Sequence, residues 1–222
     1  MTEGHVVILT ALNLEYDEVR AGLRDLTTRV HPSGTRFEVG RLYPAGCPVA
    51  LALTGMGNLA SAALTERAIA HFSPAAVIFA GVAGALRPDI SLGDVVVATH
   101  VYAYHGATSK DDGARARPRV WEVAHSIDQT ARQVARAGAW ARPLRADDMP
   151  PRVHFGPIAA GERVLDSAIS ADARWIQEHY TDALAIEMEG AGVAQAKPPE
   201  RLAAGGRHPR HQRSCRRYEG GF

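Results

Sequence analysis

The sequence predicts a single α/β domain built around a central twisted sheet. A continuous apolar run at 6–12, a second at 76–80 and a mostly apolar segment at 95–103 are typical of buried strands. An amphipathic segment at 14–26 and an alanine-rich segment at 59–69 have the pattern of helices that pack on such strands. A chain of 222 residues is long enough for one domain of this kind, and it shows no internal repeat.

The remaining elements follow from periodicity and from turn residues. The helix at 14–26 is predicted from Leu14, Val19, Leu23 and Leu26, which fall close to one face. Beyond these segments the pattern predicts, in chain order, a hairpin of strands 36–43 and 48–54, an exposed loop at 106–119, a helix at 121–140, a strand at 153–160, a helix at 171–180, a strand that ends at 186 and a short helix at 193–196.

Composition excludes several classes of function. The net charge is +1, which gives no electrostatic reason to expect binding to nucleic acid or to an acidic membrane surface. The two cysteines, Cys47 and Cys215, have neither disulfide-framework nor metal-ligand spacing, so no metal site is expected. No stretch is long and apolar enough for a signal peptide or a membrane span, and we expect a cytoplasmic protein.

The segment 185–196 holds the strongest functional signal. Glu187 and Glu189 follow a buried strand directly, and ligands of α/β sheets bind beyond the carboxyl ends of strands. These carboxylates are candidates for a hydroxyl-rich ligand, or else they are solvated turn residues. Gly190 and Gly192 are costly in a helix and therefore predict close backbone packing against a neighbour or a ligand.

A second glycine turn, Gly55-Met-Gly-Asn58, lies between a strand and a helix. This geometry presents backbone N–H groups to a polar ligand, although a bare Gly-x-Gly is a weak signal. Leu59 and Ala60 occupy the region where a dinucleotide-binding fingerprint has its third glycine. The sequence therefore predicts no nicotinamide or flavin cofactor, and no other cofactor is expected.

Three motifs together resemble the methylthioadenosine/S-adenosylhomocysteine nucleosidases, which belong to the purine nucleoside and uridine phosphorylase superfamily. They are Ala11-Leu-Asn-Leu-Glu15, Gly81-Val-Ala-Gly-Ala-Leu-Arg-Pro88 with Leu92-Gly-Asp-Val-Val-Val97, and Glu187-Met-Glu-Gly190. The resemblance covers about residues 5–196. It implies a three-layer α/β sandwich with a central twisted mixed sheet, like that of the nucleoside phosphorylases.

The resemblance also implies roles for individual residues. Glu15 matches the acid that holds the attacking water, and Glu189 the acid that binds the ribose hydroxyls. From its place in a first helical turn alone, Glu15 could instead be a residue that complements the helix dipole. The implied substrate contacts are Met188 at the sugar, Val82, Ala83 and Gly84 beside base and ribose, and Val164 and Leu165 around the adenine, where the usual aromatic residue is missing.

These matches imply hydrolysis of the N-glycosidic bond in methylthioadenosine, S-adenosylhomocysteine or a similar small purine nucleoside, by a homodimer. A phosphorolytic relative is the first alternative, although no basic phosphate ligand stands out near Gly55–Asn58. A non-catalytic nucleoside-binding module or an inactive fragment is the second. Its support is the absence of the proton donor, which in the family is an aspartate in a Ser-Asp pair after the Glu-Met-Glu motif. This chain has no aspartate after Asp182.

The sequence changes character at Lys197. We expect residues 1–196 to form the nucleosidase-like domain and 197–222 to be an aberrant, disordered tail, with the final strand and helix of the fold missing. Codons can be chosen for Arg207–Gly221 that, read one nucleotide later, encode Val-Ile-Arg-Gly-Ile-Ser-Asp, an apolar strand that ends in Ser-Asp. We therefore hypothesise a frameshift near codon 197; the alternative is a genuine disordered basic tail.

Overall fold

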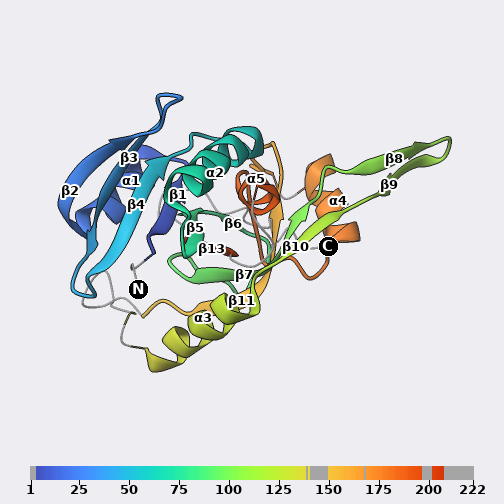
Figure 1. Ribbon diagram of the computed structural model, residues 1–222. Helices are drawn as coiled ribbons and strands as arrows, with labels where there is room; N and C mark the ends of the chain where they lie inside the picture. The colour runs from blue at the N-terminus through green and yellow to red at the C-terminus, as the bar shows by residue number, and fades with distance from the viewer. Residues whose placement is uncertain (1–3, 139, 141–149, 168, 197–201, 208–222) are drawn as a thin grey trace.

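A mixed sheet forms the centre of the molecule. The computed structural model describes residues 4–138, 140, 150–167, 169–196 and 202–207 (Figure 1). The strand order is β2-β3-β4-β1-β5-β13-β7-β11-β12-β6, and β10 pairs with β7 beside this path. In chain order the elements are β1 (Val6–Thr10), α1 (Asn13–Ala21), β2 (Leu23–Val30), β3 (Arg36–Leu42), β4 (Cys47–Leu53), α2 (Asn58–Phe72), β5 (Ala76–Val82), β6 (Gly84–Ala85), β7 (Val95–Ala103), β8 (Ala107–Lys110), β9 (Gly113–Ala116), β10 (Arg119–Glu122), α3 (His125–Ala137), β11 (Val153–Ala160), α4 (Ala171–His179), β12 (Ala185–Glu187), α5 (Gly190–Gln195) and β13 (Leu202–Arg207).

The sheet consists of two halves that run in opposite directions. In one half β1 pairs in parallel with both β4 and β5, and in the other half β11 pairs in parallel with both β7 and β12. Strand β13 joins the halves, because it is parallel to β5 and antiparallel to β7. The mixed sheet of the sequence prediction is thus confirmed.

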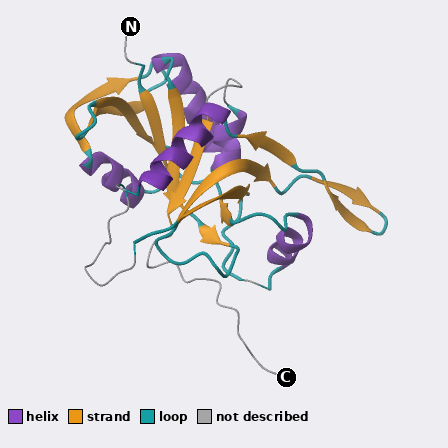
Figure 2. Cartoon of the chain, turned by 90° about the horizontal axis from the view of Figure 1, so that it is seen from below, coloured by secondary structure: helices purple, strands orange, loops and turns teal. Residues whose placement is uncertain are grey.

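Helices cover both sides of this sheet. Helices α2 and α5 lie together on one side and α3 lies on the other (Figures 1 and 2). The main core contains side chains from successive strands, among them Val7, Leu9, Ala50, Val77 and Phe79, all of which are nearly inaccessible to solvent. The predicted runs at 6–12 and 76–80 thus contain strands, although β1 ends at Thr10. In each strand one face is buried and the other is mostly half-buried.

The predicted helix at 14–26 is too long. Helix α1 ends at Ala21, and Gly22 terminates it through hydrogen bonds from its N–H to the carbonyls of Val19 and Arg20. Leu23 and Leu26 belong instead to β2, where they pack with Val49 and Leu51 in a separate small core. Leucines three apart fit a helical stripe, but they also fit a strand that contains an irregularity, and the register of β2 does shift between Arg24 and Thr27.

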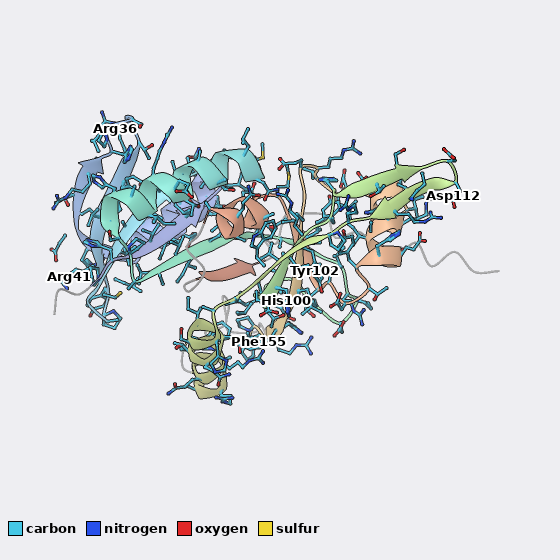
Figure 3. All side chains as sticks on the ribbon, turned by 45° about the vertical axis from the view of Figure 1, so that its right-hand side comes forward. Arg36, Arg41, His100, Tyr102, Asp112 and Phe155 are labelled. Atoms are coloured by element: carbon cyan, nitrogen blue, oxygen red, sulfur yellow. The ribbon has the colours of Figure 1, made fainter. Side chains whose placement is uncertain are left out.

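Two further predictions need correction at the charged segment. The expected loop at 106–119 is a hairpin of β8 and β9, and the expected helix at 121–140 begins only at His125. The hairpin projects from the body of the molecule, with Asp112 at its tip (Figure 3). Trp121 lies in β10, which extends the sheet by pairing with β7. A projecting two-stranded hairpin has no buried face, so its sequence lacks the apolar alternation of an ordinary strand. Its small and charged residues therefore look like those of an exposed loop.

The structure also differs from the prediction in the tail. The final strand was expected to be missing, yet β13 occupies the place between β5 and β7. Its register places Arg207 beside Val82 of β5 and Val95 of β7. Residues 197–201 and 208–222 lie outside the described residues, so the assignment of 197–222 as an aberrant tail stays a prediction for them. Within the described parts of the chain, no helix combines the length and the apolar character that crossing a bilayer requires.

Candidate functional site

Glu15 links the ends of two neighbouring strands. It lies in the first turn of α1, and its Oε2 accepts hydrogen bonds from the N–H groups of Ala11 and Leu12, each at 2.9 Å. Its Oε1 accepts a hydrogen bond of 2.8 Å from the N–H of Val82, at the end of β5. Three backbone donors therefore converge on one carboxylate where β1 and β5 end.

Glu189 is the buried carboxylate of the site. Its residue is only 5% exposed, and its Oε1 accepts a hydrogen bond of 2.8 Å from the N–H of Gly57. Its Oε2 accepts a longer one, 3.3 Å, from the N–H of Met188. Burial raises the pKa of the Glu189 carboxyl; the two N–H donors oppose this, and the charges of Glu15 and Glu162 add to it. The contribution of Glu15 to this shift indicates that the two carboxyl groups lie near each other.

Glu187 is a second buried carboxyl beside Glu189. Its Oε2 accepts hydrogen bonds from the N–H groups of Glu189, at 2.8 Å, and Gly190, at 2.7 Å. Its Oε1 is buried and has no hydrogen-bond partner among the described residues. Burial raises the pKa of Glu187 to about 8, against the effect of the two N–H donors, and Glu189 and Glu15 raise it further. At neutral pH the group is therefore mostly a neutral acid that shapes the turn leading to Glu189.

Two glycines allow the turns of the site to meet. Gly57 has a φ of 102°, a conformation that other residues rarely adopt, and this turns its N–H toward Glu189. A Cβ on Gly192 would overlap the carbonyl oxygen of Asn58, so α5 can approach α2 only because residue 192 has no side chain. The close backbone approach predicted from Gly192 is thus confirmed, and the neighbour is α2.

The structure brings several predicted substrate residues to this site. Val82 contacts Glu15, and the short strand β6 places Gly84 opposite Ile186, next to the Glu187–Glu189 turn. Ala83 connects these two residues and is buried. Met188 stands between the two buried carboxyls.

The two residues proposed to surround the adenine lie differently. Val164 is 72% exposed, and Leu165 packs against the cluster formed around Tyr104 and Ile176. Their roles stay predictions.

Sequence reasoning identified the turn of Gly57 and Asn58 but not what it contacts, and it missed Ser61 and Glu162. Ser61 lies in the first turn of α2 and donates a 2.8 Å hydrogen bond to the carbonyl of Glu189. Glu162 follows β11 and influences the pKa of Glu189. The glycine turn at 55–57 signalled a polar contact, but nothing in the sequence indicated that its partner lies 132 residues away.

Glu15, Glu187 and Glu189, near the ends of β1, β5 and β12, belong to the motifs on which the family resemblance is based. A sequence model of the phosphorylase superfamily matches residues 5–196. The chain belongs to this superfamily. The matched range coincides with the predicted domain up to residue 196, and the superfamily assignment confirms the resemblance seen in the three motifs.

Members of the superfamily with assigned activities are similar to much of the chain. It is 30% identical over 159 residues to the 5′-methylthioadenosine/S-adenosylhomocysteine nucleosidase of Maridesulfovibrio salexigens, which covers 72% of this chain and 64% of that protein. It is 27% identical over 214 residues to the ATP nucleosidase Cap17 of Escherichia coli, covering 86% of this chain and 42% of that protein. The chain thus spans less than two thirds of the length of either relative.

A solved structure shows the same fold. The 5′-methylthioadenosine/S-adenosylhomocysteine nucleosidase of Colwellia psychrerythraea, in complex with adenine, superposes with a TM-score of 0.76 at 20% identity. The superposition covers 92% of this chain and 81% of that one.

Proposed function

We propose that the protein hydrolyses the N-glycosidic bond of a purine nucleoside of the methylthioadenosine or S-adenosylhomocysteine class. The observation that carries this proposal is the convergence of Glu15 and Glu189 beside the Val82–Gly84 turn. The similarity to 5′-methylthioadenosine/S-adenosylhomocysteine nucleosidases supports the same substrate class.

The two carboxylates suit the two demands of this reaction. As the bond between C1′ and the purine nitrogen breaks, positive charge develops on the ribose ring, and the Glu189 carboxylate stabilises that charge more in the transition state than in the ground state. Water attacks C1′ and passes a proton to Glu15, which acts as the general base. The electrons of the broken bond go to the purine, which must gain a proton as it leaves.

Water is favoured over phosphate because the anion-binding position is already filled. Backbone N–H groups at the end of a strand and the start of a helix commonly bind phosphate. Here the N–H groups of Ala11, Leu12 and Val82 all donate to Glu15. A phosphate ion at this position would have to displace the carboxylate and would meet its negative charge.

Phosphate independence is the direct test. Release of adenine from methylthioadenosine is expected to proceed at the same rate with and without added phosphate, and the sugar product should be the free 5-methylthioribose. Chromatography of the products after incubation in phosphate-free buffer measures both. A strict requirement for phosphate, with the sugar 1-phosphate as product, would assign the protein to the phosphorylases instead.

The sequence lacks a residue that matches the family's proton donor. The family donor is an aspartate in a Ser-Asp pair, and this chain has no aspartate after Asp182. We therefore infer that the 222-residue chain hydrolyses nucleosides slowly, and that a frameshift near codon 197 removed the donor.

We also propose a homodimer. Five exposed apolar side chains, here called the apolar rim, lie at the ends of β1 and β4 and at the starts of α1 and α2: Leu12, Leu14, Leu53, Met56 and Leu59, which is 85% exposed. Strands β1 and β4 are neighbours with Thr10 opposite Leu53, so the segments that follow the two strands begin side by side. Exposed large apolar side chains that gather at one edge of a sheet are typical of a protein interface.

Leu59→Glu should shift the protein from dimer to monomer, because a buried charge without a partner is strongly disfavoured at an interface. Sedimentation velocity measures the change. Val134→Glu is the matched control, since Val134 is an exposed apolar residue on α3, away from the apolar rim. A wild-type protein that sediments as a monomer would refute the proposed dimer.

A further inference from the structure

Asn58 joins three segments of the site through one side-chain amide. It is the first residue of α2. Its Nδ2 donates a 2.8 Å hydrogen bond to the carbonyl of Gly161, directly after β11. Its Oδ1 accepts a 2.8 Å hydrogen bond from the N–H of Gly192 in α5. Both ends of the amide are therefore used, by backbone groups 103 and 134 residues away in sequence.

Residues next to Asn58 bind both the side chain and the backbone of Glu189. The residue before it, Gly57, donates its N–H to the Glu189 carboxylate, and Ser61, one turn later, donates its hydroxyl to the Glu189 carbonyl. The Ser61 hydroxyl is also 3.0 Å from the carbonyl oxygen of Asn58. Helix α5 starts directly after Glu189. The Asn58–Gly192 hydrogen bond therefore fixes α5, and with it Glu189, relative to the Gly55–Asn58 turn.

We propose that Asn58 is a positioning residue for Glu189. Its amide holds the Gly55–Asn58 turn against the end of β11 and against α5, so that the Gly57 N–H stays aimed at the Glu189 carboxylate. This inference rests on the proposed function, in which Glu189 binds the ribose.

The chemistry of the position explains why asparagine is suited to it. The Gly161 carbonyl needs a donor and the Gly192 N–H needs an acceptor, and a short amide supplies both at a fixed separation. Aspartate at neutral pH can only accept, so it would repel the Gly161 carbonyl and add a negative charge beside Glu162 and Glu189. Leucine has a similar shape and supplies neither group.

The test compares Asn58→Asp and Asn58→Leu with the wild-type chain by isothermal titration calorimetry with methylthioadenosine between pH 5 and pH 8. Both variants are expected to bind the nucleoside about 10-fold more weakly at pH 7, the loss that a poorly aligned hydrogen bond to a charged group causes. The pH below which binding weakens should also rise, because a displaced Gly57 N–H no longer stabilises the Glu189 carboxylate.

Asn13→Asp is the matched control. Asn13 is also the first residue of a helix beside the site, but it is exposed, so this variant adds the same charge without breaking the three-way link. Thermal unfolding establishes the folded fraction of each variant.

The possible outcomes separate the inference from the proposed function. Wild-type affinity and an unchanged pH midpoint in both Asn58 variants would overturn the positioning role. A loss of binding that only follows the loss of folded protein, with the midpoint unchanged, would also overturn it and leave Asn58 a structural residue. If the wild-type chain and Asn13→Asp both fail to bind the nucleoside, the proposed function itself fails.

Discussion

Glu189→Gln is expected to lower kcat/KM for methylthioadenosine by about 10²-fold or more in a protein that still folds. Glutamine keeps an acceptor oxygen for the Gly57 N–H. It removes the charge that, in the proposed mechanism, stabilises the positive charge on the ribose. The effect should therefore exceed the loss of a ground-state hydrogen bond. Initial rates of adenine release over a range of substrate concentrations measure it.

The pH profile gives an independent readout of the same substitution. The pKa of Glu189 is raised above its ordinary value of 4.5, chiefly by burial. Below its pKa the carboxyl is neutral, so kcat/KM of the wild-type protein should fall on the acid side, at a pH above 4.5. That limb should move to a lower pH in Glu189→Gln, because the Glu189 carboxyl no longer contributes to it. Glu178→Gln, at an exposed position of α4, is the control, and an equal loss in both variants would contradict the assigned role.

Restoring a Ser-Asp strand after residue 197 is expected to raise the rate of adenine release by at least about 10²-fold, since general acid catalysis typically contributes 10²–10⁴. The purine is a poor leaving group until it is protonated, and the proposed mechanism gives Glu15 and Glu189 other roles. The comparison needs both chains under identical conditions. Equal rates would show that the missing aspartate is not the donor in this protein.

The DNA sequence tests the origin of the missing donor separately. Resequencing around codon 197 should reveal a single-nucleotide change that restores an open frame encoding the Ser-Asp strand. A confirmed sequence without such a frame would refute the frameshift hypothesis, whatever the restored chain does.

Local patterns in the sequence were sufficient to predict most of the fold. The apolar runs gave β1, β5 and β7 because central strands are covered at least partly on both faces and so carry few charged side chains. The errors arose where a local pattern suits two structures: Leu23 and Leu26 fit both a helix and an irregular strand, and the charged residues of β8 and β9 fit both a loop and a projecting hairpin.

The sequence predicted the site residues that lie in recognisable motifs, but not the contacts between those motifs. Glu189 stood out because it follows a buried strand, whereas the role of Glu15 came from the family resemblance; both roles stay predictions. The contacts of Asn58 with Gly161 and Gly192 could not be found, since they depend on how three separate turns meet in space. A glycine signals that some group comes close, but it does not identify that group.

The central position of β13 has a consequence for how the protein is made. Strands β5 and β7 do not pair with each other, and each has β13 as its neighbour. Ribosomal synthesis produces β13 after every other described strand, so until then the nascent chain carries two half-sheets with open edges. Such edges readily pair with other chains, and contacts between segments far apart in sequence form slowly. During this interval a β13 from a second copy could enter the gap, which makes strand exchange between nascent chains a specific hazard of this topology.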